Sequence, residues 1–127
     1  VEVQAWYGLR YAQGTRRFEA ARATTGRVAA TSLDQVPVFP QRPSRLAAVM
    51  GAGSANPQSE DAYFLNVWAP AQAQGLPVLF FIHGGAWMMG SPKSHRRITA
   101  RFARITGGAV LAIEVDVPGM PCHRFAG

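Results

Sequence analysis

The sequence has 127 residues, room for one modest domain or part of a larger one, with 13 Lys and Arg against 7 Asp and Glu and a single cysteine. That lone cysteine excludes a disulfide scaffold and a zinc site built on paired cysteines. Apolar residues make up 48%, which is typical of a globular core, yet no apolar run exceeds the five residues of 78–82, far too few to span a membrane.

The formal charge of +6 raises the question of an acidic partner. Twelve of the thirteen basic residues are arginines, Lys93 being the exception, which favours codon bias in a GC-rich genome as the origin of the charge. A nucleic-acid groove gathers its charge on one face, whereas the N-terminal arginines are scattered. We therefore expect neither nucleic acid nor a membrane as a partner. The scattered arginines are Arg10, Arg16, Arg17, Arg22, Arg27 and Arg42.

The first half of the chain shows few regular elements. A short apolar start is followed by a stretch rich in arginine and alanine up to residue 30. Residues 34–60 carry four prolines and two glycines, which predicts a long excursion with little regular structure. Compact domains seldom tolerate such a loop unless a larger body supports it.

Two strands are predicted next along the chain. The aromatic and β-branched run 63–68 is typical of a strand, and Pro70 ends it. The run 78–82 is apolar on both faces, as expected of a central strand buried on both sides of a sheet. A His-Gly-Gly turn at 83–85 follows it directly.

A helix and a third strand come after this turn. Ser91 and Pro92 predict the cap and first turn of the helix, with His95 solvated, and glycines 107–108 end it. Residues 109–115 form a mostly buried strand. Strand, glycine loop, helix and strand predict a crossover unit of a parallel sheet, so the fold class is α/β. The apolar stripe of the helix is Ile98, Phe102 and Ile105, and its solvent side is Arg96, Arg97, Arg101 and Arg104.

The glycine-rich turn suits backbone N–H groups that approach a negative ligand. A P-loop is excluded because Ser91 and Pro92 separate Gly90 from Lys93. A dinucleotide fingerprint is excluded because no register supplies Gly-x-Gly-x-x-Gly. An oxyanion hole fits, since in α/β-hydrolases one donor lies on a His-Gly-Gly loop after an early strand.

Three motifs in order resemble the N-terminal region of the type B carboxylesterases, the family that includes the cholinesterases. Ser-Glu-Asp-Ala-Tyr-Phe-Leu-Asn-Val-Trp-Ala-Pro at 59–70 is similar to the family segment Ser-Glu-Asp-Cys-Leu-x-Leu-Asn-Val-Trp-x-Pro. Leu-Pro-Val at 76–78 through His-Gly-Gly-Ala-Trp at 83–87 resembles its loop, and Gly-Leu-Arg-Tyr-Ala at 8–12 resembles its opening. The resemblance covers nearly residues 1–115 and implies a mixed sheet from the N-terminal part of an α/β-hydrolase fold.

The resemblance implies roles for individual residues. The amides of Gly85 and Ala86 match the oxyanion donors, and Gly84 matches the turn that lets them converge. Trp87 matches an aromatic residue beside the acyl pocket, the alternative being simply a large buried side chain. The implied chemistry uses no cofactor and no metal, and its substrate is a small-molecule ester.

Supporting roles follow from the same resemblance. Arg17 and Glu60 match a buried structural Arg–Glu pair that holds the N-terminal segment. His83 matches a loop-supporting residue rather than a catalytic base, and Asp61 is expected to be a turn and packing residue.

The chain also departs from the family pattern. Ala62 stands where animal members carry a disulfide cysteine, which fits a bacterial member. Residues 116–127 resemble nothing in the family. For one choice of codons, Val-Pro-Gly at 117–119 contains the Tyr-Arg of the family in the shifted frame, so a frameshift is our hypothesis for this tail.

No catalytic triad is recognisable in residues 1–127. No serine lies in Gly-x-Ser-x-Gly, Ser54 coming closest, and adjacent Cys122 and His123 usually point apart in an extended segment. We therefore interpret 1–127 as the N-terminal segment of a carboxylesterase that carries only the oxyanion-hole loop and is inactive alone. A non-catalytic binding module on the same scaffold, or an arginine-rich nucleic-acid binder, is the alternative. We also expect the chain to self-associate through an open strand edge at 109–115.

Overall fold

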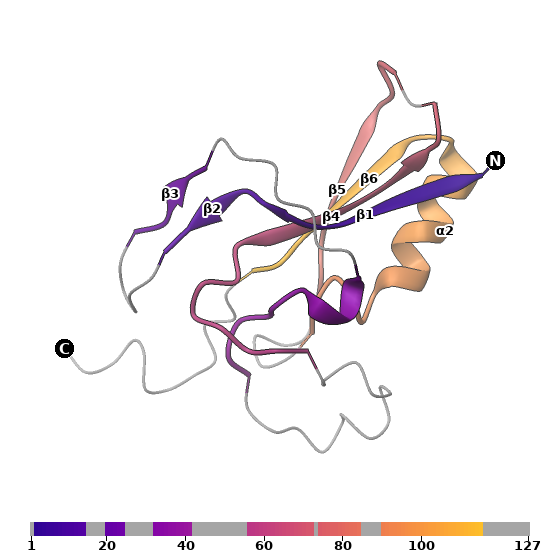
Figure 1. The fold of residues 1–127 in the computed structure, drawn as a ribbon. Coiled ribbons are helices and arrows are strands. Elements are labelled where there is room, and N and C mark those ends of the chain that lie inside the picture. The colour runs from indigo at the N-terminus through magenta and orange to yellow at the C-terminus, as the bar shows by residue number, and fades with distance from the viewer. Residues whose placement is uncertain are drawn as a thin grey trace.

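The structure is a computed structural model, and it describes residues 2–14, 20–24, 32–41, 56–72, 74–84 and 90–115. A mixed sheet has the strand order β1 (Val3–Arg10), β4 (Phe64–Pro70), β6 (Ala109–Ile113), β5 (Val78–Ile82), and the helix α2 (Arg96–Thr106) packs on one of its faces (Figure 1). The short strands β2 (Ala12–Gln13) and β3 (Arg22–Ala23) pair separately, and η1 (Leu33–Gln35) is a 3₁₀ turn.

The predicted unit of strand, glycine loop, helix and strand is confirmed. β5 pairs with β6 in parallel through α2, as a crossover connection requires, whereas β4 is antiparallel to both β1 and β6. The sheet is therefore mixed, and the α/β class expected from the sequence holds for the described residues.

The end of α2 is where the sequence placed it, but its start is not. Gly107 adopts a left-handed φ of 65°, and its N–H donates to the carbonyl of Ala103. The helix begins only at Arg96, because residues 91–95 form a turn in which the N–H of Ser94 donates to the carbonyl of Ser91. Ser91 therefore caps this turn rather than the helix.

The predicted apolar stripe of α2 does not face the sheet. Ile98, Phe102 and Ile105 are 49%, 40% and 70% exposed. Thr99 and Ala103 are buried instead, because small side chains let the helix approach the sheet closely. The residues that form the core with Ala103 are Trp68, Val110 and Ala112.

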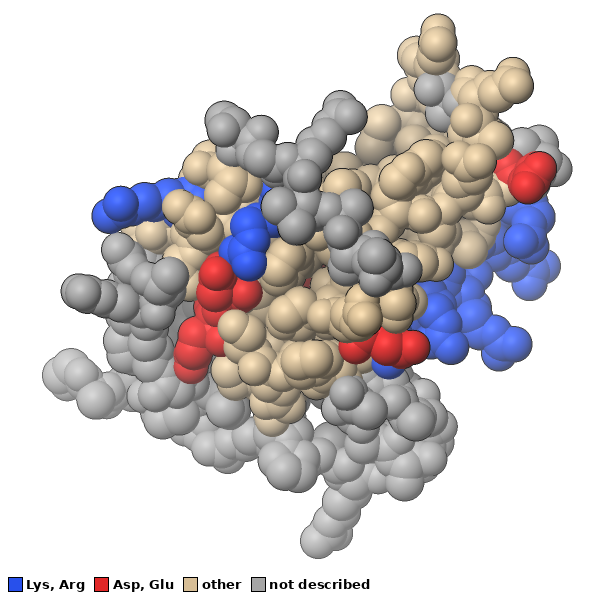
Figure 2. Space-filling view, viewed as in Figure 1, with Lys and Arg blue, Asp and Glu red and all other residues tan. Residues whose placement is uncertain are grey.

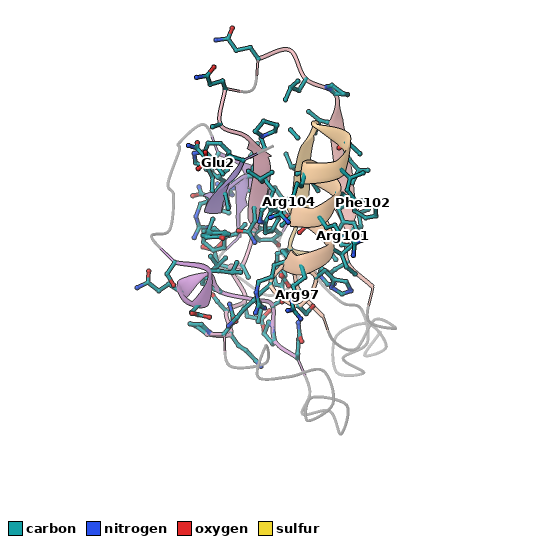
Figure 3. The ribbon with its side chains drawn as sticks, turned by 90° about the vertical axis from the view of Figure 1, so that its right-hand side faces the viewer. Glu2, Arg97, Arg101, Phe102 and Arg104 are labelled. Atoms are coloured by element: carbon teal, nitrogen blue, oxygen red, sulfur yellow. The ribbon has the colours of Figure 1, made fainter. Side chains whose placement is uncertain are left out.

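The arginines of α2 are exposed, as expected. They gather at the side of the molecule where α2 lies (Figure 2). Phe102 lies on the side of the helix toward β5, and Arg97 and Arg104 lie on the opposite side (Figure 3). The helix is therefore amphipathic, but most of its apolar side is not covered by the described sheet.

The prediction that β5 is a central, buried strand is wrong for the described residues. β5 is an edge strand, and Phe80 on it is 56% exposed. β6, which was expected to carry the open edge, lies between β4 and β5. Exposed apolar side chains lie on both elements, on β5 at Val78, Leu79, Phe80 and Ile82 and on α2 at Ile98, Phe102 and Ile105.

β1, which the sequence analysis did not assign, is held to β4 by a buried side chain. Its register shifts between Trp6 and Leu9, and Gly8 in this irregularity has a φ of 64°. The N–H of Gly8 donates to Oδ1 of buried Asn66 at 2.9 Å. The Asn of the Leu-Asn-Val-Trp motif therefore satisfies a backbone group that the bulge frees. Within the described ranges, no helix combines the length and apolarity needed to cross a bilayer.

We propose that the chain self-associates through the edge of β5, because unpaired N–H and C=O groups beside exposed apolar side chains favour strand pairing. Phe80→Lys is expected to shift the mass measured by analytical ultracentrifugation toward that of the monomer. Ile105→Lys, which places the same charge on α2 away from the strand edge, is the matched control and should have the smaller effect. A wild-type chain that sediments as a monomer over the micromolar range would overturn the proposal.

Candidate functional site

The parallel register of β5 and β6 brings two ionisable side chains to one end of the sheet. Ile82 pairs with Ile113, so the next residue of each strand, His83 and Glu114, emerges at the same edge. Both side chains are buried, and Nε2 of His83 lies 3.9 Å from Oε1 of Glu114. The loop that the sequence analysis assigned to chemistry therefore starts from a buried acid–imidazole pair.

His83 contacts the loop through its other ring nitrogen. Nδ1 lies 3.1 Å from the carbonyl oxygen of Gly84, the contact expected of a loop-supporting residue. Burial lowers the pKa of His83, the hydrogen bond to Gly84 opposes this in part, and the nearby His95 lowers it further. The ring is therefore neutral at pH 7.

Glu114 was missed in the sequence analysis, where it was one residue of a mostly buried strand. Burial raises the pKa of its carboxyl to about 8, and a hydrogen bond from the backbone of Phe39 opposes this shift in part. An ionisable residue at the end of an otherwise apolar strand was the signal available. The hydroxyl of Tyr11 donates to the backbone carbonyl of Glu114 at 2.9 Å, which ties the end of β6 to the segment after β1.

Gly90 closes the described part of the loop against Gly84. Its φ is 109°, and an added Cβ would clash with the carbonyl oxygen of Gly84 and lie 2.9 Å from Nδ1 of His83. Nε2 of Gln41 donates to the Gly90 carbonyl at 2.6 Å. No such restriction applies at Gly84, where an added Cβ would meet no atom within 4 Å. Of the two loop glycines that the structure describes, Gly90 is therefore the one with a steric demand for glycine.

His95 is not the solvated residue that was predicted. It is half-buried, its ring stacks on that of His83 with centroids 6.2 Å apart, and it lies 5.7 Å from the ring of Phe81. Its Nδ1 lies 2.9 Å from Oγ of Ser94. The turn before α2 thus covers one face of the His83 ring, which contributes to the burial of the pair.

Several predicted site residues lie outside the described residues. These are Gly85 and Ala86 of the oxyanion hole, Trp87, Arg17, and the tail 116–127 with Cys122 and His123. Glu60 is described and exposed, whereas the resemblance implies a buried position. Its pairing with Arg17, and the turn role of Gly84, stay predictions.

An ion pair made by Asp61, the residue after Glu60, does connect the N-terminal segment to the sheet. Nη1 of Arg10 lies 2.7 Å from Oδ1 of Asp61, which also accepts from the N–H of Gly14 at 3.2 Å. The guanidinium also lies 4.4 Å from the centre of the Phe64 ring. Asp61, which was expected to be a turn and packing residue, is thus the ion-pair partner of Arg10. In the described ranges, no three His, Cys, Asp or Glu side chains gather as a metal site requires.

Comparisons with known proteins agree with the family resemblance. A model of the Carboxylesterase family matches residues 1–106. A probable N-octanoylanthranilate hydrolase of Rhodococcus erythropolis is 34% identical over 116 residues, which are 89% of this chain and 26% of that protein. A solved Geobacillus stearothermophilus carboxylesterase is 36% identical, with a TM-score of 0.68 over 91% of this chain and 23% of its own. A solved thermophilic PNB esterase is 28% identical with a TM-score of 0.68, over 91% and 24%. The chain thus spans about a quarter of the length of these relatives.

Gly90→Ala is expected to lower the free energy of unfolding by about 2–5 kcal/mol, the sum of left-handed backbone strain and a clash with the Gly84 carbonyl. Gly75→Ala is the matched control, because Gly75 has a φ of 62° and an added Cβ there meets no atom within 4 Å. Urea unfolding of both variants separates the two contributions. Equal losses would contradict the close packing of Gly90 on the loop.

Proposed function

The chain belongs to the carboxylesterase family, and its sheet is the N-terminal part of the α/β-hydrolase fold. From this premise we propose that the protein hydrolyses carboxylic esters through a serine acyl-enzyme. The observation that carries the proposal is the His-Gly-Gly-Ala loop directly after β5, whose first residue is buried and bonded to the second. We assign the amides of Gly85 and Ala86 to the oxyanion hole.

The loop would act on the tetrahedral intermediate. A serine Oγ attacks the ester carbonyl carbon, its proton passes to a histidine base, and the carbonyl oxygen becomes an anion. Collapse of this intermediate expels the alcohol, which takes the proton, and water then hydrolyses the acyl-enzyme. Two preorganised amides aimed at the oxyanion contribute at this step, and losing one costs about 3–4 kcal/mol.

The nucleophile, its histidine and the acid are assigned outside residues 1–127, because no serine here lies in Gly-x-Ser-x-Gly. The greater length of the relatives, of which this chain spans about a quarter, supports this assignment. Trp87 is assigned to the acyl-pocket side of the loop. Residues 1–127 would thus form one wall of the active site. By themselves they would not hydrolyse esters.

Sequencing the encoding DNA across codons 109–127 and several hundred bases beyond is the first experiment. We expect Tyr-Arg in the shifted frame near codon 117 and a Gly-x-Ser-x-Gly codon run downstream. The protein encoded by that reading should hydrolyse p-nitrophenyl acetate, and residues 1–127 should not. If the given frame simply stops after Gly127, or the longer protein hydrolyses no ester, the non-catalytic binding module replaces this proposal.

In that longer protein, Ala86→Pro is expected to lower kcat by about 10²–10³-fold, because proline removes the backbone N–H that would bind the oxyanion. Ala86→Gly, which changes the same residue but keeps the N–H, is the matched control and should retain most of the activity. Steady-state kinetics with a p-nitrophenyl ester measures both. Equal kcat values for the two variants would remove Ala86 from the oxyanion hole.

A further inference from the structure

The buried pair behind the loop has hydrogen-bonding capacity that the oxyanion-hole chemistry does not use. Oε1 of Glu114 and Nε2 of His83 both lack a hydrogen-bond partner in the described part of the chain, and they face each other at 3.9 Å. Buried polar atoms are almost always hydrogen-bonded, because an unpaired one keeps the full cost of its desolvation. A hydrogen bond between these two atoms would satisfy both, and it requires that one of them carries a proton.

The contact of His83 with Gly84 decides which atom carries that proton. A backbone carbonyl only accepts hydrogen bonds, so Nδ1 of His83 must be the N–H that donates to Gly84. In a neutral imidazole the other nitrogen, Nε2, is then a bare acceptor. An ionised carboxylate is also only an acceptor, whereas a carboxylic acid has an O–H to donate.

We propose that Glu114 is a positioning residue, whose protonated carboxyl donates a hydrogen bond from Oε1 to Nε2 of His83 and thereby holds the ring against Gly84. A shift of about 1 Å brings the two atoms from their present separation to hydrogen-bond distance. The chain of contacts runs from Glu114 through His83 to Gly84, the residue before the assigned oxyanion donors. The catalytic consequence rests on the proposed function, while the hydrogen bond itself does not.

The surroundings of the pair contain few other groups that could supply the proton. Tyr11 already donates its hydroxyl to the backbone of Glu114, and His95 stacks on His83 without bonding to it. Lys93 lines a small cavity next to Glu114, but its ammonium pairs with Asp34 at 2.6 Å. Glu114 is the remaining donor that faces Nε2 among the described residues.

The titration of Glu114 agrees with this geometry and gives it a measurable sign. Its pKa is about 8 in the folded chain against an ordinary 4.5, so the folded state holds the proton more tightly. Its contribution to stability is fully present below pH 4.5 and is lost as the pH rises through 8. Because the pKa of His83 is lowered, its titration has the opposite effect and lowers stability as the pH falls below its ordinary pKa of 6.5. Between about pH 6.5 and 8, Glu114 is therefore the member of the pair whose titration lowers the free energy of unfolding as the pH rises.

Glu114→Gln tests this sign in the full chain. Glutamine stays neutral and donates an N–H to Nε2, so urea unfolding should lose the decline in stability between pH 6.5 and 8. Glu2→Gln, at an exposed glutamate, is the matched control and should keep that decline. A Glu114→Gln slope equal to that of the control would overturn the proposal.

Ring ¹⁵N spectra of the histidines report the protonation directly, on associated or monomeric protein alike. The resonances that vanish in His83→Gln identify His83, and at pH 7 we expect a protonated Nδ1 and an unprotonated, hydrogen-bonded Nε2. The same pattern should persist in Glu114→Gln. Two protonated nitrogens at pH 7, the signature of an imidazolium beside an ionised Glu114, would overturn the proposal even if every variant folds.

The catalytic consequence is measured in the longer protein that hydrolyses esters. Glu114→Leu, which removes the donor, should lower kcat by up to about 100-fold with little change in KM, as misplacement of a catalytic loop does, and Glu114→Gln should restore it. The wild-type kcat should fall as the pH rises through 8, and that fall should be absent in Glu114→Gln. A protein without esterase activity but with the expected ¹⁵N pattern would refute the proposed function alone, whereas unchanged kcat in Glu114→Leu would refute the positioning role.

Discussion

The parallel register between β5 and β6 is the constraint on which the site depends. Pairing Ile82 with Ile113 makes His83 and Glu114 neighbours at the end of the sheet, although 30 residues of sequence separate them. The helix between the strands must then cross back over the sheet, and it can approach closely because Thr99 and Ala103 face the sheet. The packing of α2 against Trp68 and Val110 thus helps to set the position at which the loop after β5 begins.

The same packing explains why the apolar stripe of α2 is exposed. With Ala103 turned to the core, the larger side chains of Ile98, Phe102 and Ile105 are left exposed. Phe102 lies on the side of the helix toward β5 (Figure 3). Exposed apolar side chains on both a helix and an edge strand have the pattern of interior surfaces, since monomeric proteins rarely leave much contiguous apolar area uncovered. The periodicity of α2 therefore indicates a second packing surface on the helix, besides the one that contacts the described sheet.

The sequence predicted the order of β4, β5, α2 and β6 well because each of them has a local cause. Pro70 ends β4, the glycine at 107 ends α2, and the run 78–82 is too apolar to be anything but a sheet strand. The burial of each strand was harder to predict. Apolar residues on both faces of a strand indicate that both faces are covered, but they do not indicate which part of the chain covers them. The ion pair of Asp61 with Arg10 could not be predicted either, because it depends on the β1–β4 register.

Glu114 shows why the site itself was only partly readable. Its importance comes from a neighbour across the sheet, and a single sequence contains no record of that pairing. Once the pairing is known, electrostatics explains why a neutral acid belongs there. An ionised carboxylate close to the proposed oxyanion hole would oppose the charge that the hole must stabilise, because like charges repel. Burial keeps the proton on Glu114, and the group then supports the loop through a hydrogen bond without placing a negative charge beside it.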